Sequence, residues 1–161
     1  ASSFHYEEGN AWGAPDKYLF QAITDYVKSE QPGEKVFHFI MTSSNHPPYS
    51  VNIEKAGFDS SRVIGKGNDS IKKDDKTVIE IGHFWYADMT MGKMIREVEK
   101  IEPTMLTVIT GAHSERFDFA KELDIPTFSA IPFIVYGQGV DPNWLNKDSF
   151  GGALQINPTL A

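Results

Sequence analysis

Three short apolar runs, separated by stretches of helical periodicity, constrain the fold of this chain more than any other feature. The runs are residues 36–41 (Val-Phe-His-Phe-Ile-Met), 105–110 and 131–136. Runs of this length are typical of strands buried on both faces, as in a parallel sheet. Apolar residues at helical spacing occupy residues 16–29 and 77–100. Because helices alternate with buried strands, the sequence predicts an α/β fold whose parallel or mixed sheet is flanked by helices.

The ends of the helices are marked by residues with positional preferences. Asp16, directly after Pro15, is expected to be the N-cap of the first helix, and the turn sequence of residues 31–33 follows its end. Pro103 follows the second helix. The buried stripe of that helix is predicted to comprise Ile81, Phe84, Trp85, Asp88, Met91, Met94, Ile95 and Val98. A further short helix is expected at residues 117–123.

Composition limits the classes of function. The 161 residues predict a single domain, residues 1–161. The 22 acidic residues outnumber the 15 lysines and arginines, and no basic stripe is present, so nucleic acid is not an expected partner. The chain has no cysteine, which excludes disulfides, cysteine-ligated zinc, iron–sulfur clusters and thiol nucleophiles. No apolar run approaches the roughly 20 residues that a membrane helix needs.

The two loops after the first two apolar runs hold the best candidates for chemistry. In parallel sheets, ligands sit beyond the carboxyl ends of strands, here at residues 42–49 and 111–116. His46 in the first loop can bind a metal when neutral or a phosphate when charged. In the second loop, His113 can ligate a metal and Arg116 can hold an anion with its guanidinium fork. The alternatives are a surface histidine without a role and a simple turn into a helix.

Six short motifs occur in an order that resembles a known enzyme family. They are Trp12-Gly13-x-Pro15-Asp16-Lys17, Thr42-x-Ser44-x-His46-Pro47-Pro48-Tyr49, Tyr86-x-Asp88-x-x-x-Gly92, Thr110-Gly111-Ala112-His113-Ser114-x-Arg116, Ile131-Pro132-Phe133-Ile134-x-Tyr136-Gly137 and Ile156-x-Pro158-Thr159-Leu160. From Trp12 to its last residue, the chain is similar to the C-terminal half of a sulfatase-like catalytic domain in the alkaline phosphatase superfamily. It most resembles the lipoteichoic acid synthase and phosphoglycerol transferase group.

The resemblance implies a fold, a location and a reaction. The fold would be part of an alkaline-phosphatase-like sandwich with a mixed, mostly parallel sheet. The parent enzyme would be membrane-anchored, with this domain on the extracytoplasmic face of a bacterial membrane. A divalent metal, manganese or else zinc or magnesium, would activate a threonine nucleophile. That threonine would attack the phosphodiester of a phospholipid or glycerol-phosphate headgroup and form a covalent intermediate.

The same resemblance assigns roles to single residues. His46 resembles the histidine that contacts the substrate phosphate, and Arg116 is the second predicted substrate-binding residue. His113 resembles a metal ligand, whereas Ala112 stands where the family has an aspartate ligand and offers no donor atom. In the family, the nucleophilic threonine and the other metal-binding carboxylate lie upstream, in the N-terminal half of the domain. No catalytic residue is therefore expected in residues 1–161, and the isolated chain is expected to be inert.

The sequence leaves two other interpretations open. The chain can be a non-catalytic module that binds an anion or a headgroup after losing its metal site, which Ala112 favours. It can also belong to a sulfatase or a phosphoethanolamine transferase of the same superfamily, because one fold hosts several reactions. The expected macromolecular partner is the missing N-terminal half of the domain. Otherwise, an open sheet edge would favour self-association.

Overall fold

A computed structural model describes residues 9–64, 76–113, 129–144, 151–152 and 156. The chain falls into two compact units, Ala1–Pro103 and Thr104–Ala161, and each is considered by itself. The first unit holds two helices and the second a two-stranded sheet, so the described part of the chain is mixed α/β. The single domain expected for residues 1–161 stays a prediction.

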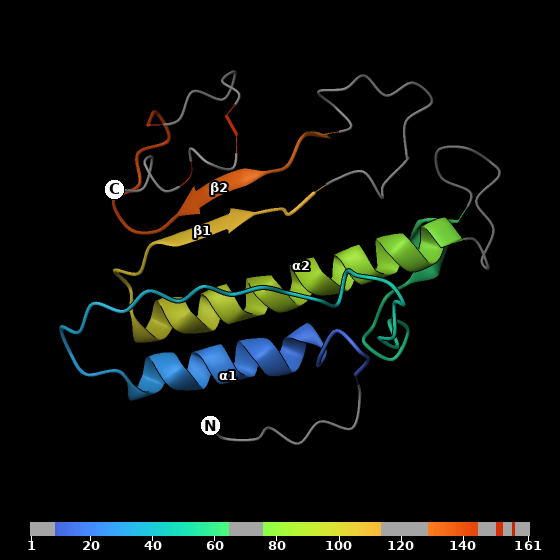
Figure 1. Ribbon diagram of the computed structural model, residues 1–161, viewed down its shortest axis with the longest axis horizontal. Helices are drawn as coiled ribbons and strands as arrows, with labels where there is room; N and C mark the ends of the chain where they lie inside the picture. Colours follow the sequence, from blue (N-terminus) through green and yellow to red (C-terminus); the bar gives the residue numbers. More distant parts are fainter. Residues whose placement is uncertain (1–8, 65–75, 114–128, 145–150, 153–155, 157–161) are drawn as a thin grey trace. The chain divides into compact units, whose positions relative to one another are not determined.

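Two parallel helices form the framework of the first unit. Helix α1 spans Asp16–Ser29 and helix α2 spans Lys76–Ile101. They pack side by side and run in the same direction, with the chain between them running back the opposite way (Figure 1). Both predicted helices are confirmed, with ends within one residue of those expected. Their apolar core consists of Phe20, Val27, Val78, Tyr86 and Val98.

The first residue of α1 is not the cap that the sequence predicted. The N-cap is Pro15, which makes no side-chain capping bond, and Asp16 is the first residue inside the helix. The Asp16 carboxylate instead binds backbone amides of residues 43 and 44. The prediction was wrong because a distant loop competes for this carboxylate, and local sequence gives no sign of that competition.

Residues 36–41 differ most from the prediction. They are extended, but they belong to no strand of the described chain, and within the first unit they are not buried on both faces. Phe37, Phe39 and Met41 are 83%, 80% and 77% exposed, while the alternate residues His38 and Ile40 are half-buried. Only one face of this segment therefore packs inside its unit. We call residues 36–41 the exposed segment.

The buried face of α2 is rotated relative to the predicted stripe. Phe84 and Asp88 are exposed, contrary to prediction, whereas His83 and Tyr86 are buried. Gly82 explains part of the rotation. A Cβ atom at Gly82 would lie 2.2 Å from Ile53 Cδ1 and 3.1 Å from the Phe58 ring. Residues 53–58 thus pack directly against α2 at Gly82, where the helix has no side chain to separate them.

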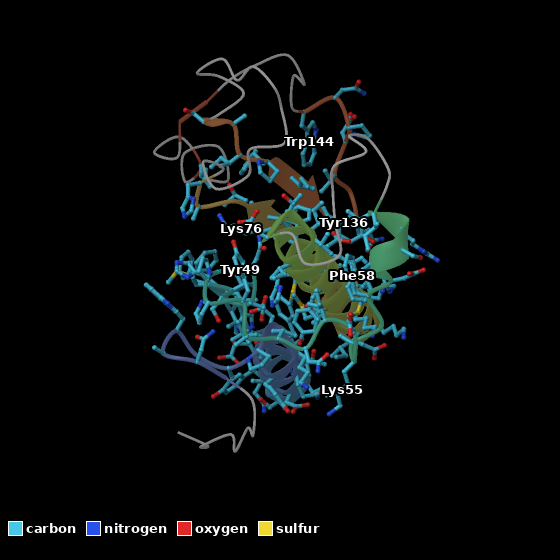
Figure 2. All side chains as sticks on the ribbon, turned by 90° about the vertical axis from the view of Figure 1, so that its right-hand side faces the viewer. Tyr49, Lys55, Phe58, Lys76, Tyr136 and Trp144 are labelled. Carbon is cyan, nitrogen blue, oxygen red and sulfur yellow. The ribbon has the colours of Figure 1, made fainter. Side chains whose placement is uncertain are left out.

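The loop that packs there contains one short helix. Residues Ser60–Arg62 form the 3-10 helix η1, whose N-cap Asp59 accepts a hydrogen bond from the Ser61 amide. The Phe58 ring, labelled in Figure 2, lies 5.6 Å from the Trp85 ring between centroids, and this contact joins the loop to α2. Residues 65–75 lie outside the described residues.

A two-stranded sheet is the core of the second unit. Strand β1, Thr107–Thr110, pairs with β2, Phe133–Tyr136, and Thr107 lies opposite Tyr136. The strands at 105–110 and 131–136 are confirmed in shorter form. Their pairing is antiparallel, which a mixed sheet allows, and a parallel-sheet sandwich is not seen among the described residues. The helix predicted at 117–123 lies outside those residues.

The exposure of side chains alternates along β2, which differs from the burial on both faces that its apolar sequence predicted. Phe133 and Val135 are half-buried, whereas Ile134 and Tyr136 are exposed. Apolar side chains on both faces of a strand suggest two covered faces, but in this unit only one face of β2 is covered.

Among the residues that the structure describes, no helix is long and apolar enough to cross a membrane.

Candidate functional site

The loop of residues 42–50, here called the His46 loop, is fastened to the first turn of α1. Oδ1 of Asp16 accepts hydrogen bonds from the amides of Ser43 and Ser44, each at 3.0 Å. The Asp16 amide in turn donates to Ser44 Oγ at 2.8 Å. Asp16 is fully buried, so these bonds form away from water, where charge-assisted bonds are strong. The carboxylate also lies favourably at the positive end of the helix dipole.

A second connection joins the same loop to the residues before α1. The Trp12 and His46 rings lie 4.2 Å apart between centroids and are tilted by 44°. Asn10 Nδ2 donates to Ser50 Oγ at 2.9 Å. Reciprocal backbone bonds between Asn10 and Gly13 hold the turn that carries Trp12. Two motifs about 30 residues apart in sequence therefore make one structure.

The His46 ring is oriented by its own loop. Its Nδ1 lies 2.6 Å from the Pro47 carbonyl oxygen, a geometry in which Nδ1–H donates to that acceptor. The loop backbone turns tightly, since the His46 amide donates to Ser43 O and the Tyr49 amide donates to His46 O. A neutral ring with its proton on Nδ1 has its lone pair on Nε2. Among the described residues Nε2 has no partner, so it can meet a ligand beside the exposed Trp12 ring.

Helix α2 supports the far end of the loop through His83, which the sequence analysis did not single out. His83 is almost fully buried, its Nδ1 donates to Ile79 O at 2.8 Å, and its ring lies 5.1 Å from that of Tyr49. Burial lowers the pKa of His83 below its ordinary value of 6.5, partly opposed by the backbone carbonyls of residues 79, 49 and 51. The neutral ring is therefore a supporting group of the loop.

Two buried oxygen atoms of the loop and of α1 accept no hydrogen bond from the described residues. They are Asp16 Oδ2 and Asn45 Oδ1. Both are oxygen acceptors. Asp16 Oδ2 belongs to the carboxylate that binds the Ser43 and Ser44 amides, and Asn45 is the next residue of the loop. Both atoms are buried, so the group of this loop that can donate to a ligand is the histidine ring, when it is protonated.

The remaining predicted site residues belong to the second unit or lie beyond the described residues. Ala112 and His113 are exposed and directly follow β1. Arg116 lies outside the described residues. Because His46 and His113 belong to different units, their predicted convergence stays a prediction. The described residues contain no group of three or more histidines and carboxylates that could hold a metal ion, and the role of His113 as a single metal ligand stays a prediction.

His38 behaves as a structural histidine. Its Nε2 lies 2.5 Å from Glu30 Oε1, and both side chains are about four-fifths buried. This contact fastens the exposed segment to the end of α1. The site residue that sequence reasoning missed is Asp16, because its role depends on Ser43 and Ser44 reaching it from a loop 27 residues further along the chain.

No family model matches this chain, and no curated protein or solved structure matches it either.

Proposed function

We propose that the chain forms the C-terminal part of a metal-dependent catalytic domain that acts on phosphodiester headgroups, of the phosphoglycerol transferase kind. The observation that carries the proposal is the His46 loop. The first two of the six motifs are joined there by hydrogen bonds to Asp16 and by the contact between Trp12 and His46. Residues that resemble a family motif thus have a structural reason to occur together.

In this reaction class, His46 would hold a phosphoryl oxygen. With Nδ1–H bound to the Pro47 carbonyl, a protonated ring donates from Nε2 to an anion, and its orientation is fixed before substrate arrives. Arg116 would be the second group to bind the phosphate. A divalent metal would supply neutralisation of charge on the phosphoryl oxygens and activation of the nucleophile. His113 would be one ligand of that metal, and the resemblance assigns the nucleophile and the other metal-binding carboxylate to the rest of the parent enzyme.

The finer fold and location belong to the same proposal. The exposed segment would lie inside a larger, mostly parallel sheet of an alkaline-phosphatase-like sandwich. Its exposed face of Phe37, Phe39 and Met41 supports this, because an extended segment with one uncovered apolar face is stabilised by neighbouring strands and a covering layer. The parent would be membrane-anchored on the extracytoplasmic side.

One observation favours a second candidate. Ala112 stands at the position expected for an acidic metal ligand, and a methyl group has no donor atom. A chain with a lost metal site could retain the His46 loop as a non-catalytic binding module for an anion or a headgroup.

The test uses the native protein from its source, with Mn²⁺ and phosphatidylglycerol vesicles. We expect glycerol phosphate transfer or release, and at least about a tenfold loss of this activity in His46→Gln. His38→Gln is the matched control, because His38 contacts Glu30 away from the His46 loop. A native product near 18.0 kDa without activity would contradict the enzymatic proposal.

The two candidates are separated by binding. If the native protein is inactive, but glycerol phosphate shifts the His46 ring signals in NMR spectra, the binding module is supported. If it is inactive and those signals do not move, both candidates are wrong.

A further inference from the structure

A groove lies along the interface between α1 and α2, on the side that faces residues 51–56. The hollow has a volume of about 540 Å³, within the range of sites for small organic ligands. Its lining comes from both helices and the loop, all inside the first unit: Lys17, Phe20, Gln21, Thr24, Lys28, Val51, Asn52, Lys55, Ala56, Tyr86, Met89, Thr90, Lys93, Met94 and Glu97. We call this hollow the lysine groove.

The rim of the lysine groove is strongly cationic. Four lysines line it (Lys17, Lys28, Lys55 and Lys93) against a single carboxylate, Glu97. That carboxylate is already bound by Lys100 at 2.8 Å, which lies outside the groove. The chain as a whole carries a net charge of −7, so a site with four cations departs from the general character of the protein. Such a local positive field attracts anions.

The lysines differ in their present contacts. Lys28 lies 3.7 Å from Asp25, and the Lys17 ammonium lies 4.7 Å above the Tyr18 ring centroid. Neither Lys55 nor Lys93 forms an ion pair with any of the described residues. Lys55 projects from the loop at the lower edge of Figure 2. These two lysines are the ones best able to turn toward a bound anion.

The floor of the groove is apolar, although it contains two threonines. Thr24 Oγ1 donates to Phe20 O and Thr90 Oγ1 donates to Tyr86 O, each at 2.8 Å within its own helix. Their hydroxyl protons are therefore directed to the helix backbone and not into the groove. Besides the amides Gln21 and Asn52, the rest of the lining is largely apolar: Phe20, Val51, Ala56, Tyr86 and the flexible side chains of Met89 and Met94.

The length of the groove argues against a site for a lone inorganic anion. Lys17 and Lys28 stand eleven residues apart on α1, which is about 16 Å at the rise of an α-helix. Tyr86 and Glu97 span the same distance on α2. An inorganic phosphate would reach only part of this rim and would leave the apolar floor uncovered. A ligand that uses both surfaces has an anionic group joined to an elongated apolar body.

We propose that the lysine groove binds a small amphiphilic anion, a phosphate or carboxylate carried on an apolar chain. The anionic group would be held by Lys55 and Lys93, and the chain would lie along Phe20, Met89 and Met94. This site is separate from the His46 loop, and it does not depend on the reaction proposed above.

The first experiment titrates decyl phosphate, below its micellar concentration, into the isotopically labelled chain and follows the methyl signals of Met89 and Met94. We expect saturable shifts. Decyltrimethylammonium, which has the same chain and the opposite charge, should bind at least about tenfold more weakly, and so should glycerol phosphate, which has the anion without the chain. Equal binding of both decyl compounds would overturn the proposal, because it would indicate apolar adsorption only.

Variants locate the site. Lys55→Gln and Lys93→Gln should each weaken decyl phosphate binding about three- to tenfold, because each removes one charge-assisted contact. Lys35→Gln is the matched control, since it removes the same charge from an exposed position outside the groove. If Lys35→Gln weakens binding as much as the groove variants do, the effect is one of net charge and the proposal is wrong.

A second variant tests the apolar floor without changing charge. Ala56→Phe would fill part of the groove and should abolish the Met89 and Met94 shifts while leaving the circular dichroism spectrum unchanged. Replacing Phe37 and Phe39 with serine should leave binding unchanged, because the exposed segment is not part of the groove. Loss of binding in this double variant, with binding retained in Ala56→Phe, would place the ligand on the exposed segment and overturn the proposal.

Discussion

The exposed segment and the His46 loop are consecutive in the chain, yet they are held in opposite ways. Residues 36–41 are apolar, extended and largely uncovered on one face. The polar loop that follows, with two prolines, is fastened by Asp16, Trp12 and His83. The usual expectation would place the apolar run in the core and leave the polar loop loose.

The difference shows that a few specific contacts can hold a short polar loop in place, whereas they cannot satisfy the backbone groups and apolar side chains of a whole strand. Asp16 satisfies two amides of the loop with one oxygen atom, and single contacts from Trp12 and His83 add to this. A strand needs a neighbouring strand along its whole length to pair its backbone groups, and a covering layer over each apolar face. The four predictions below test this contrast, in order of decreasing effect on stability.

Replacing Asp16 with alanine should have the largest effect. It removes the acceptor for the Ser43 and Ser44 amides, and Ser44 is buried. Losing two charge-assisted bonds should lower the free energy of unfolding by about 2–4 kcal/mol. Urea unfolding followed by circular dichroism at 222 nm measures the change.

Two controls define the Asp16 result. Asp25→Ala changes an exposed carboxylate on the same helix and should stay within about 0.5 kcal/mol of the parent chain. Asp16→Asn keeps an acceptor oxygen and should recover part of the loss. If Asp16→Ala is no worse than Asp25→Ala, the loop is not fastened through Asp16.

Replacing Gly82 with alanine should have the next largest effect. The new methyl group would meet Ile53 Cδ1 and the Phe58 ring, so the covering loop must shift. We expect a net loss of about 1–2 kcal/mol, since overpacking exceeds the gain in helix propensity. Gly92→Ala is the matched control on α2, because its methyl group meets only the flexible end of Arg96 and should stabilise the chain slightly. Stabilisation by both variants would contradict the packing of residues 53–58 on α2.

Much of the local structure was predictable from the sequence, and much of the wider arrangement was not. Helical periodicity and the flanking Pro-Gly turn gave α1 and α2 within one residue of their ends. The sequence also pointed to His46 and its loop. It missed Asp16 and His83 as supports, because both act through contacts between segments distant in the chain.

The misreading of residues 36–41 has a similar cause. An apolar run indicates that a segment can be buried on both faces. Whether it is buried depends on other elements of the chain that must pack against those faces. In β1 and β2, the same pattern occurs in an antiparallel pair with one face exposed. Composition alone does not distinguish an apolar strand covered on both faces from one with an exposed face.

The third prediction concerns pH. Burial lowers the pKa of His83 in the folded chain below 6.5, so the unfolded chain binds more protons as the pH falls through that value. The contribution of neutral His83 to stability is therefore present above pH 6.5 and is lost as the pH falls toward the folded-state pKa. One proton limits the slope to about 1.4 kcal/mol per pH unit.

Urea unfolding between pH 7.5 and 5 should show this loss of stability, and His83→Gln should reduce the slope. His38→Gln is the control, since His38 contacts Glu30 and not the loop. An unchanged slope in His83→Gln would mean that another group causes the pH dependence.

The fourth prediction concerns the exposed segment and should have the smallest effect on stability. Phe37 and Phe39 are more than three-quarters exposed, so their joint replacement with serine should change the free energy of unfolding by no more than about 0.5 kcal/mol. The same change should reduce self-association in sedimentation velocity experiments and lower the binding of an apolar dye, because it removes most of an uncovered apolar face.

Ile40→Ser is the matched control, since Ile40 is half-buried in the same segment. It should cost more stability than the double phenylalanine variant and leave self-association unchanged. The reverse pattern would show that Phe37 and Phe39 pack inside the chain. In that case the exposed segment would be held by its own unit, as the His46 loop is, and the contrast between them would disappear. The expected pattern would instead mean that the segment is stabilised on one face only, so that its other face requires a surface outside its own unit.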